Sequence, residues 1–362
     1  MGIEMDKIFN GVFKDKNVLV TGHTGFKGSW LITWLNELGA NVIGYALDPY
    51  REKDNFVVTN LSSKITDIRG DVRDFDKLLS VFEEYKPEIV FHLAAQPLVR
   101  LSYEEPRETY ETNVMGTVNL LEASKQVESV RVVVNVTSDK CYENKEMIWG
   151  YRENDPMGGY DPYSSSKGCA ELVTSAYRRS FFNPQDLDKH GVALASVRAG
   201  NVIGGGDWAK DRLMTDCITA LQARKKIKIR SPQAIRPWQH VLEPLSGYLL
   251  LASKLYEEPK KYIGGWNFGP EESSIVTVGE LVEKLIDCWG SGDWIDTSSN
   301  DEPHEAELLK LDISKARYYL NWSPRLDVEE MLELTVDWYK NYQDNNVYEL
   351  CVKQIKNFIK KG

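Results

Sequence analysis

The sequence predicts an α/β fold: a doubly wound parallel sheet followed by a smaller C-terminal α/β domain. In the first half, short apolar runs alternate with longer amphipathic segments, the pattern of strands joined by right-handed helical crossovers. After about residue 198 this alternation breaks, and glycine and proline separate shorter elements. The 362 residues suit two domains of roughly 150 residues each. We expect a first domain over 1–198, onto which about 235–262 packs back, and a second over 199–362.

The elements follow from apolar periodicity and from the glycines and prolines that end them. Buried strands are predicted at Asn17–Thr21, Asn41–Ala46, Glu88–Leu93, Arg131–Val136 and Val192–Val197. Helices are predicted at Lys27–Leu38, around Pro106–Gln126 and around Pro162–Phe181. The Lys-rich end, Lys353–Lys361, is expected to form a solvated helix face.

Composition excludes several classes of protein. Lys plus Arg is 44 and Asp plus Glu is 54, a net charge of −10 that argues against general nucleic-acid binding. No apolar run approaches the roughly 20 residues of a membrane helix, and the charged start has no signal-peptide core. Five scattered cysteines and five histidines form no metal-ligand pattern. We therefore expect a cytoplasmic protein without metal, membrane or nucleic-acid partners.

A glycine-rich turn follows the first predicted strand and opens the first predicted helix. It has the pattern G-x-x-G-x-x-G, which allows a tight turn and close backbone approach to a pyrophosphate at the helix N-terminus. The alternative is an ordinary glycine turn. The strand–turn–helix context favours a Rossmann-type dinucleotide site formed by Gly22, Thr24, Gly25, Phe26, Lys27 and Gly28.

Acidic residues after the next strands indicate which dinucleotide binds. Asp48 lies 20 residues after Gly28, where a carboxylate accepts both ribose hydroxyls and favours NAD over NADP. Arg51 is the competing signal, because it could hold a 2′-phosphate instead. Asp71 and Val72 suit a contact with the adenine edge, and the alternative is a carboxylate that merely ends a strand.

Tyr163 and Lys167 form a Y-x-x-x-K pair on one face of a predicted helix. A second match, Tyr256 with Lys260, contains Pro259 and is rejected, since proline disrupts a regular helix. A lysine ammonium and a nicotinamide cation beside Tyr163 would lower its pKa from about 10 and make it a base. Ser138, at the carboxyl end of a predicted strand, is placed to hold the substrate oxygen.

These motifs, together with Leu93-Ala94-Ala95-Gln96 and the segment 111–117, resemble the extended short-chain dehydrogenases/reductases that act on nucleotide sugars. Thr137-Ser138-Asp139-Lys140 resembles the signature of their 4,6-dehydratases. The resemblance implies NAD as cofactor, with Leu93, Ala94, Ala95 and Thr112 also lining its site. It further implies a homodimer or a tetramer assembled through the helices around 106–126 and 162–181, and a place in deoxysugar biosynthesis such as that of lipopolysaccharide O-antigens.

The same resemblance implies a reaction. Tyr163 takes the C4 hydroxyl proton while NAD accepts hydride, Lys140 takes the C5 proton, and Asp139 protonates the leaving C6 hydroxyl. Hydride then returns to C6, and C5 is reprotonated. Neighbouring strand residues point to opposite faces, so the strand must end or turn at Asp139. Related dehydratases carry Asp-Glu where this sequence has Asp139-Lys140. That departure, with Arg236–Val241, favours a cytidine diphosphate sugar over thymidine and guanosine diphosphate sugars.

The substrate contacts that the resemblance implies are Gln96, Asn201, Arg212, Arg236 and His304. Relatives often carry Arg near His304, and this sequence has none at Pro303–Glu305. Trp238 and His240 are expected to pack in the core. Two rival functions remain: a nucleotide-sugar 4-epimerase or reductase, which needs no Asp139–Lys140 pair, and a dinucleotide-sensing binding protein without catalysis.

Overall fold

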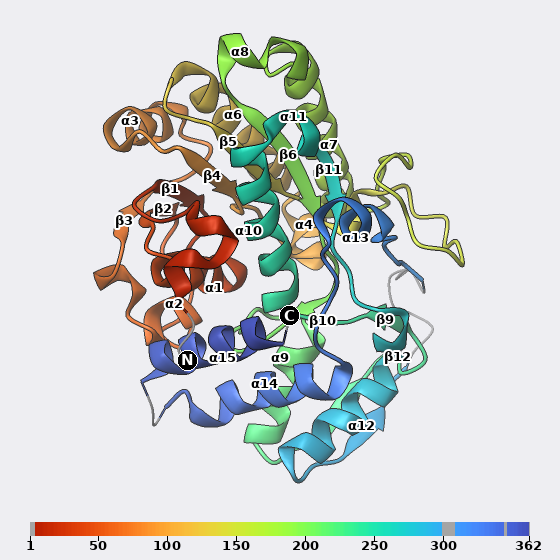
Figure 1. Ribbon diagram of the computed structural model, residues 1–362. Coiled ribbons are helices and arrows are strands. Elements are labelled where there is room, and N and C mark those ends of the chain that lie inside the picture. The colour runs from red at the N-terminus through yellow and green to blue at the C-terminus, as the bar shows by residue number, and fades with distance from the viewer. Residues whose placement is uncertain (1–3, 299–307, 344–345, 362) are drawn as a thin grey trace.

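Figure 1 shows the computed structural model, which describes residues 4–298, 308–343 and 346–361. Its centre is a parallel sheet of seven strands within those residues, in the order β11-β6-β5-β4-β1-β2-β3. The strands are β1 (Asn17–Thr21), β2 (Asn41–Ala46), β3 (Thr66–Arg69), β4 (Ile89–His92), β5 (Val132–Val136), β6 (Ala193–Arg198) and β11 (Gly264–Asn267). Strand order reverses between β1 and β4, so a crevice is expected beyond their carboxyl ends.

Helices cover both faces of this sheet, and each face has its own core. In β5, Val132, Val134 and Val136 face one core while Val133 faces the other, as the two-residue period of a strand requires. The first face is covered by α1 (Phe26–Glu37), α10 (Leu242–Glu257) and α15 (Val347–Lys360). The second is covered by α3 (Phe75–Tyr85), α6 (Gly116–Gln126) and α7 (Pro162–Ser180).

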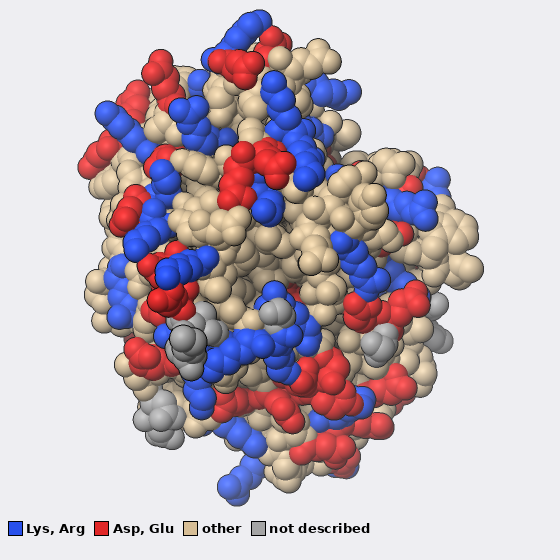
Figure 2. All heavy atoms as spheres, viewed as in Figure 1, with Lys and Arg blue, Asp and Glu red and all other residues tan. Residues whose placement is uncertain are grey.

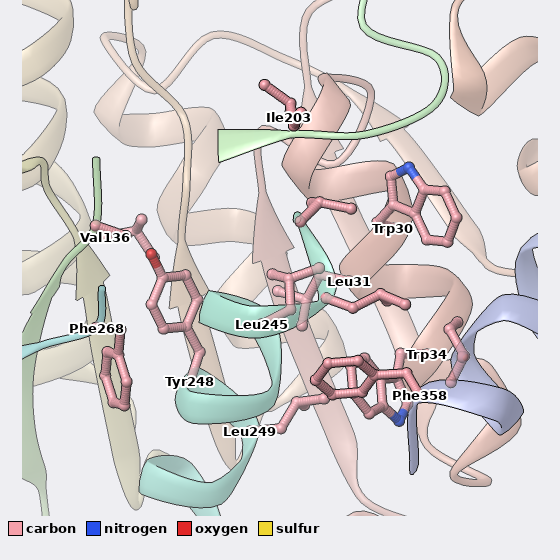
Figure 3. Close-up of a cluster of buried hydrophobic side chains, with 14 of the residues drawn as sticks. Trp30, Leu31, Trp34, Val136, Ile203, Leu245, Tyr248, Leu249, Phe268 and Phe358 are labelled. Carbon is pink, nitrogen blue, oxygen red and sulfur yellow. The ribbon is translucent and has the colours of Figure 1, made fainter. Parts of the chain in front are cut away.

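Figure 3 shows the first core, in which large aromatic residues join three helices far apart in sequence. Trp30 and Trp34 of α1 lie near Leu245 and Leu249 of α10, and the Trp34 ring meets Phe358 of α15 at 5.9 Å. Burial of such rings is the main source of stability for this face of the sheet.

The second half adds short paired strands and further helices beside the sheet. The pairs are β7 (Val202–Ile203) with β10 (Gln239–His240), β9 (Ile235–Pro237) with β12 (Ile275–Thr277), and β8 (Ile227–Ile229) with β13 (Trp294–Asp296). The remaining helices are α2 (Asn55–Val58), α4 (Val99–Glu104), α5 (Pro106–Tyr110), α8 (Leu187–His190), α9 (Leu213–Gln222), α11 (Pro259–Tyr262), α12 (Val278–Trp289), α13 (Ser314–Leu320) and α14 (Val328–Asn341). Capping boxes at Thr277 and Asp327 begin α12 and α14.

The structure confirms the α/β class and the parallel sheet. All five predicted strands form, with ends shifted by at most one residue, whereas β3 and β11 were not predicted. The single helix expected around 106–126 is instead α5, a wider π-type turn over Glu111–Met115, and α6. The domain division at 198 stays a prediction, but α10 and β11 both follow that boundary and pack on or extend the main sheet.

Charge on the surface is mixed. Figure 2 shows acidic and basic side chains interspersed on the visible face, with a basic group where Figure 1 places α15. Lys353 and Lys360 are exposed there, as expected for a solvated helix face. Among the described residues, no helix is both long and apolar enough to cross a membrane, and no cluster of three metal-ligating side chains is found.

Candidate active site

The glycine turn between β1 and α1 is shaped by close backbone approach. Gly22 has φ +72°, and a Cβ there would lie 2.7 Å from the Ala94 nitrogen. A Cβ at Gly28 would overlap the Gly22 carbonyl oxygen. Gly25 is exposed and precedes α1 with no side-chain cap on the helix N–H groups. Uncapped N–H groups beside side-chain-free backbone fit the pyrophosphate of a dinucleotide.

The carboxylates expected to hold the adenosine lie at the ends of β2 and β3. Asp48 is exposed and accepts a 3.1 Å contact from Nε of Arg69, a residue that sequence reasoning missed. Asp71 binds the Arg73 guanidinium at 2.6 Å, so its carboxylate is already engaged. Val72 is buried beneath Gly116, where a Cβ would come within 2.7 Å of it.

The catalytic loop leaves β5 and turns at once. Ser138 caps a 3₁₀ turn over Asp139–Cys141, and its hydroxyl accepts a hydrogen bond from the Lys140 N–H at 3.2 Å. The same hydroxyl donates to Oδ1 of Asp139 at 2.9 Å. Asp139 is buried and Lys140 half-buried. The turn required for both side chains to serve one site is therefore present.

Tyr163 and Lys167 lie one turn apart near the start of α7, and both are buried. Nζ of Lys167 donates to the Val136 carbonyl at 3.4 Å, which ties α7 to the end of β5. Burial raises the pKa of Tyr163 to about 12, an effect that contact with Ser138 opposes. Burial lowers the pKa of Lys167 to about 8. Burial thus acts against the lowering expected for Tyr163, which also requires the charge of the nicotinamide.

Behind the loop lies a buried ion pair that sequence reasoning missed. Glu171 of α7 binds Arg198 of β6 through two contacts of 2.8 Å. Glu171 also accepts from the Thr137 hydroxyl at 2.5 Å and from the Ser196 hydroxyl at 2.7 Å. Arg198 further donates to the Tyr142 hydroxyl at 2.5 Å. Thr137 and Tyr142 flank the catalytic loop, so this network fixes the loop to the helix that carries Tyr163. The one sequence signal is the position of Glu171, four residues after Lys167.

The segment after β4 lines the crevice beside the glycine turn. Ala94 N–H donates to the Thr21 hydroxyl at 3.2 Å, which places Leu93, Ala94 and Ala95 next to that turn. Gln96, expected to bind substrate, uses its side chain on Thr109 (2.9 Å) and on both backbone groups of Leu98. Thr112 lies in the π-type turn, whose Asn113 binds the Gln96 N–H at 2.8 Å.

The second half supplies the other wall. Arg212 pairs with Asp207 at 2.6 Å, and its positive charge acts to lower the pKa of Tyr163, so the two residues lie within electrostatic range. Asn201 has φ +32°, and its carbonyl accepts from the Gln239 N–H at 3.2 Å. Arg236 is half-buried in β9. The prediction for His304 falls outside the described residues.

The structure therefore brings Ser138, Asp139, Tyr163, Lys167 and Arg212 to one place. Lys27 lies near this group. Its pKa is lowered to about 8, mainly by burial and then by the charges of Arg212 and Lys167, whereas the charge of Asp139 acts to raise it. Trp238 and His240 are buried, as expected for core residues. A hydroxyl, a carboxyl, a phenol and two lysines in one cluster suit proton transfer.

The chain is similar to known proteins over most of its length. The family model described as GDP-mannose 4,6 dehydratase matches residues 19–335. The chain is 56% identical over 351 residues to the CDP-glucose 4,6-dehydratase of Salmonella typhimurium. The match covers 97% of this chain and 97% of that protein.

More distant relatives share the fold. The UDP-glucose 4-epimerase of Mycolicibacterium smegmatis is 27% identical, over 89% of this chain and 98% of its own. The solved structure of MoeE5 in complex with UDP-glucuronic acid and NAD is 25% identical, with a TM-score of 0.75, and the match covers 90% of this chain and 99% of that one.

Proposed function

This chain belongs to the GDP-mannose 4,6-dehydratase family, and we propose that it is a hydro-lyase converting CDP-glucose to CDP-4-dehydro-6-deoxyglucose. The observation that carries the proposal is the turn at Ser138–Lys140: Ser138 contacts both Asp139 and Tyr163, and Lys140 follows in the same turn. The 56% identity to a CDP-glucose 4,6-dehydratase over nearly the whole chain supports the cytidine substrate. An epimerase has no use for the acid–lysine pair, and the epimerase relative is only 27% identical.

The cofactor is NAD, which when bound supplies a reversible hydride acceptor for C4 and C6 of the sugar. The uncapped start of α1 and the bare backbone of Gly22 and Gly28 would hold its pyrophosphate. Asp48 would hold the adenosine ribose and Val72 the adenine. Leu93, Ala94, Ala95 and Thr112 would line the remaining surface beside the glycine turn.

Protein groups carry the proton steps. Tyr163 accepts the C4 hydroxyl proton, and Lys167 supplies positive charge near the resulting tyrosine. Once C4 is a ketone, the C5 proton is acidic, and Lys140 accepts it. Asp139 gives its proton to the C6 hydroxyl, which leaves as water. The Ser138 hydroxyl, held between Tyr163 and Asp139, orients the two groups.

Substrate is held by the second half in this proposal. Arg212 and Arg236 bind the diphosphate, because guanidinium groups donate two hydrogen bonds to such anions. Asn201 contributes from the left-handed turn after β6. The hydrogen bonds already made by Gln96 favour a different part for it: holding the loop that meets the substrate.

The test is incubation with CDP-glucose in deuterated water. The product should develop the alkali-induced absorbance of a 4-keto sugar and carry deuterium at C5. Parallel reactions with dTDP-glucose and GDP-mannose should run far more slowly. An epimerised product without C5 deuterium would refute dehydration, and no conversion of any of the three sugars would favour the binding-protein alternative.

We also propose a cytoplasmic homodimer or tetramer. Exposed apolar side chains lie on α4, α5 and α7, in the π-type turn and directly after α7, namely Leu101, Tyr103, Tyr110, Met115, Leu172 and Phe181. In sedimentation velocity, Leu172→Glu should yield monomers, whereas Tyr50→Glu, a change at an exposed residue outside these helices, should leave assembly unchanged. Monomeric wild-type protein would contradict the proposal.

A further inference from the structure

We propose that Gly200 is a positioning residue for the acid Asp139. Its lack of a side chain gives the carboxyl its place beside Ser138 and Tyr163. The inference rests on the proposed dehydratase function, because it concerns the step in which the C6 hydroxyl leaves.

Asp139 lies directly against Gly200, just beyond the end of β6. A Cβ built on Gly200 would overlap Oδ2 of Asp139 and would lie 2.5 Å from its Cγ and 3.2 Å from its Oδ1. These three atoms are the nearest to that Cβ, and all belong to Asp139. A single methyl group at position 200 would therefore meet the proposed acid first.

The backbone of Gly200 gives no other reason for glycine. Its φ lies outside the left-handed range, unlike that of Gly22 or Gly206, so an alanine could adopt the same backbone conformation. Glycine at position 200 is thus explained by the space that Asp139 occupies. It is not explained by a left-handed turn that would require glycine.

The wall formed by Gly200 is also held in place. Nε2 of Gln239 donates to the Gly200 carbonyl and to the Phe268 carbonyl, both at 3.1 Å, and Gln239 is itself buried. On the other side, the Asp139 N–H donates to the Ala199 carbonyl at 3.4 Å. Because the backbone is anchored from both sides, an added methyl group would displace the carboxyl and not the strand end.

Displacing the carboxyl should affect one chemical step. Asp139 would lose its hydrogen bond from Ser138, and its proton would no longer meet the C6 hydroxyl. Tyr163 and Lys167 come from α7 and would keep their positions. Oxidation at C4 should therefore continue while loss of water slows.

The experiment compares Gly200→Ala with Gly269→Ala in the intact enzyme. Gly269 is a matched control near the same wall, because a Cβ there meets only Ile313 and Leu311 at 3.5 Å, an ordinary contact. Gly200→Ala should lower turnover of CDP-glucose on the order of 100-fold, as a displacement of about 1 Å at a reacting group does. Absorbance of reduced nicotinamide should build up during the reaction. Gly269→Ala should stay within about twofold of wild type in both readouts.

A double-mutant cycle with Asp139→Ala tests whether the effect runs through Asp139. In the Asp139→Ala background, Gly200→Ala should change turnover by less than about twofold. In the same Asp139→Ala background, Gly200→Ala should leave the melting temperature unchanged. In the wild-type background, Gly200→Ala should lower the melting temperature. This thermal comparison keeps the test valid even where Gly200→Ala alone folds poorly.

Two results would overturn the inference: wild-type turnover in Gly200→Ala, or an equal loss with and without the Asp139 carboxyl. Failure of the proposed function looks different. It appears in the wild-type enzyme as missing 4-keto product, or as full activity in Asp139→Asn, whatever Gly200→Ala does.

Discussion

The two walls of the active site differ in how their buried polar groups are satisfied. In the wall built from β5, β6 and α7, each carboxylate oxygen of Glu171 accepts two hydrogen bonds, and the loop that carries Ser138 is fixed to this network. In the wall built from the second half, three successive residues each bury a polar atom that has no partner within the described chain: Trp238 Nε1, Gln239 Oε1 and His240 Nε2.

The difference separates two tasks. A buried polar group without a partner costs about 1–3 kcal/mol, and native proteins keep few of them except where water or a ligand completes the bonding. The Glu171 network of the first wall is complete in the protein alone, which suits groups that must be aligned before the substrate arrives. The second wall carries Arg212 and Arg236, the groups proposed for binding, and its three unpaired atoms are buried in the core.

The first wall should fail most severely at its chemical groups. Lys140→Ala should lower turnover by about 10²–10⁴-fold, the usual contribution of an acid–base group, and should slow deuterium incorporation at C5 by the same factor. Steady-state rates and mass spectrometry of the product measure both. Lys145→Ala, an exposed lysine of the following loop, is the control. Unchanged turnover in Lys140→Ala would remove it from the role of base.

Breaking the network behind that wall should mainly affect folding. Glu171→Gln leaves Arg198 buried without its counter-charge and should reduce the free energy of unfolding by about 3–5 kcal/mol in urea titration. The double variant Glu171→Met/Arg198→Met should lose less, since neither charge remains. Glu122→Gln, at a more exposed carboxylate that also binds a tyrosine, provides the comparison. Equal losses in the single and double variants would argue against an uncompensated charge.

Next to the second wall, the buried carboxyl of Glu243 should make the stability of the fold depend on pH. Its Oε1 accepts from the N–H groups of Arg325 and Leu326, its Oε2 has no partner, and burial raises its pKa from 4.5 to about 7. The folded state therefore holds a proton that the unfolded state releases, so the stability from this group is complete below about pH 4.5 and is lost as pH rises to about 7.

Between pH 5 and 8, the wild type should lose about 2–3 kcal/mol of stability relative to Glu243→Gln, whose amide cannot ionise. Urea titrations at several pH values measure the difference. Parallel pH curves for the two proteins would show that Glu243 keeps an ordinary pKa.

The smallest expected effect is at the binding wall itself. Arg236→Gln should raise KM for CDP-glucose about tenfold and leave kcat within about twofold, since a lost charged hydrogen bond is worth about 1.5–3 kcal/mol. Arg179→Gln, an exposed change on α7, should alter neither. A fall in kcat at constant KM would move Arg236 from binding to chemistry.

Local sequence was sufficient for much of this molecule. Apolar runs locate the strands that are buried on both faces, whereas β3 (T-D-I-R) is short, charged and half-buried, and β11 (G-G-W-N) begins with glycines that read as a break. Tyr163 and Lys167 are recognisable because one helical turn relates them.

The remaining site residues escape local reasoning. Glu171 and Arg198 are 27 residues apart in sequence, and Gly200 has meaning only beside Asp139, some 60 residues earlier. Such contacts exist only after the strands have aligned.

One contact in the first core has a consequence for synthesis on the ribosome. The Trp34 face of α1 is completed by α15, through the ring of Phe358 and hydrogen bonds of Asn36 and Glu37 with Tyr348 at 2.7 and 2.9 Å. About 310 residues separate the end of α1 from the start of α15. At roughly 5–20 residues per second, a nascent chain exposes this tryptophan-rich surface for about 15–60 s before its last helix emerges. The apolar face of α1 therefore stays exposed for most of the time that synthesis of the chain takes.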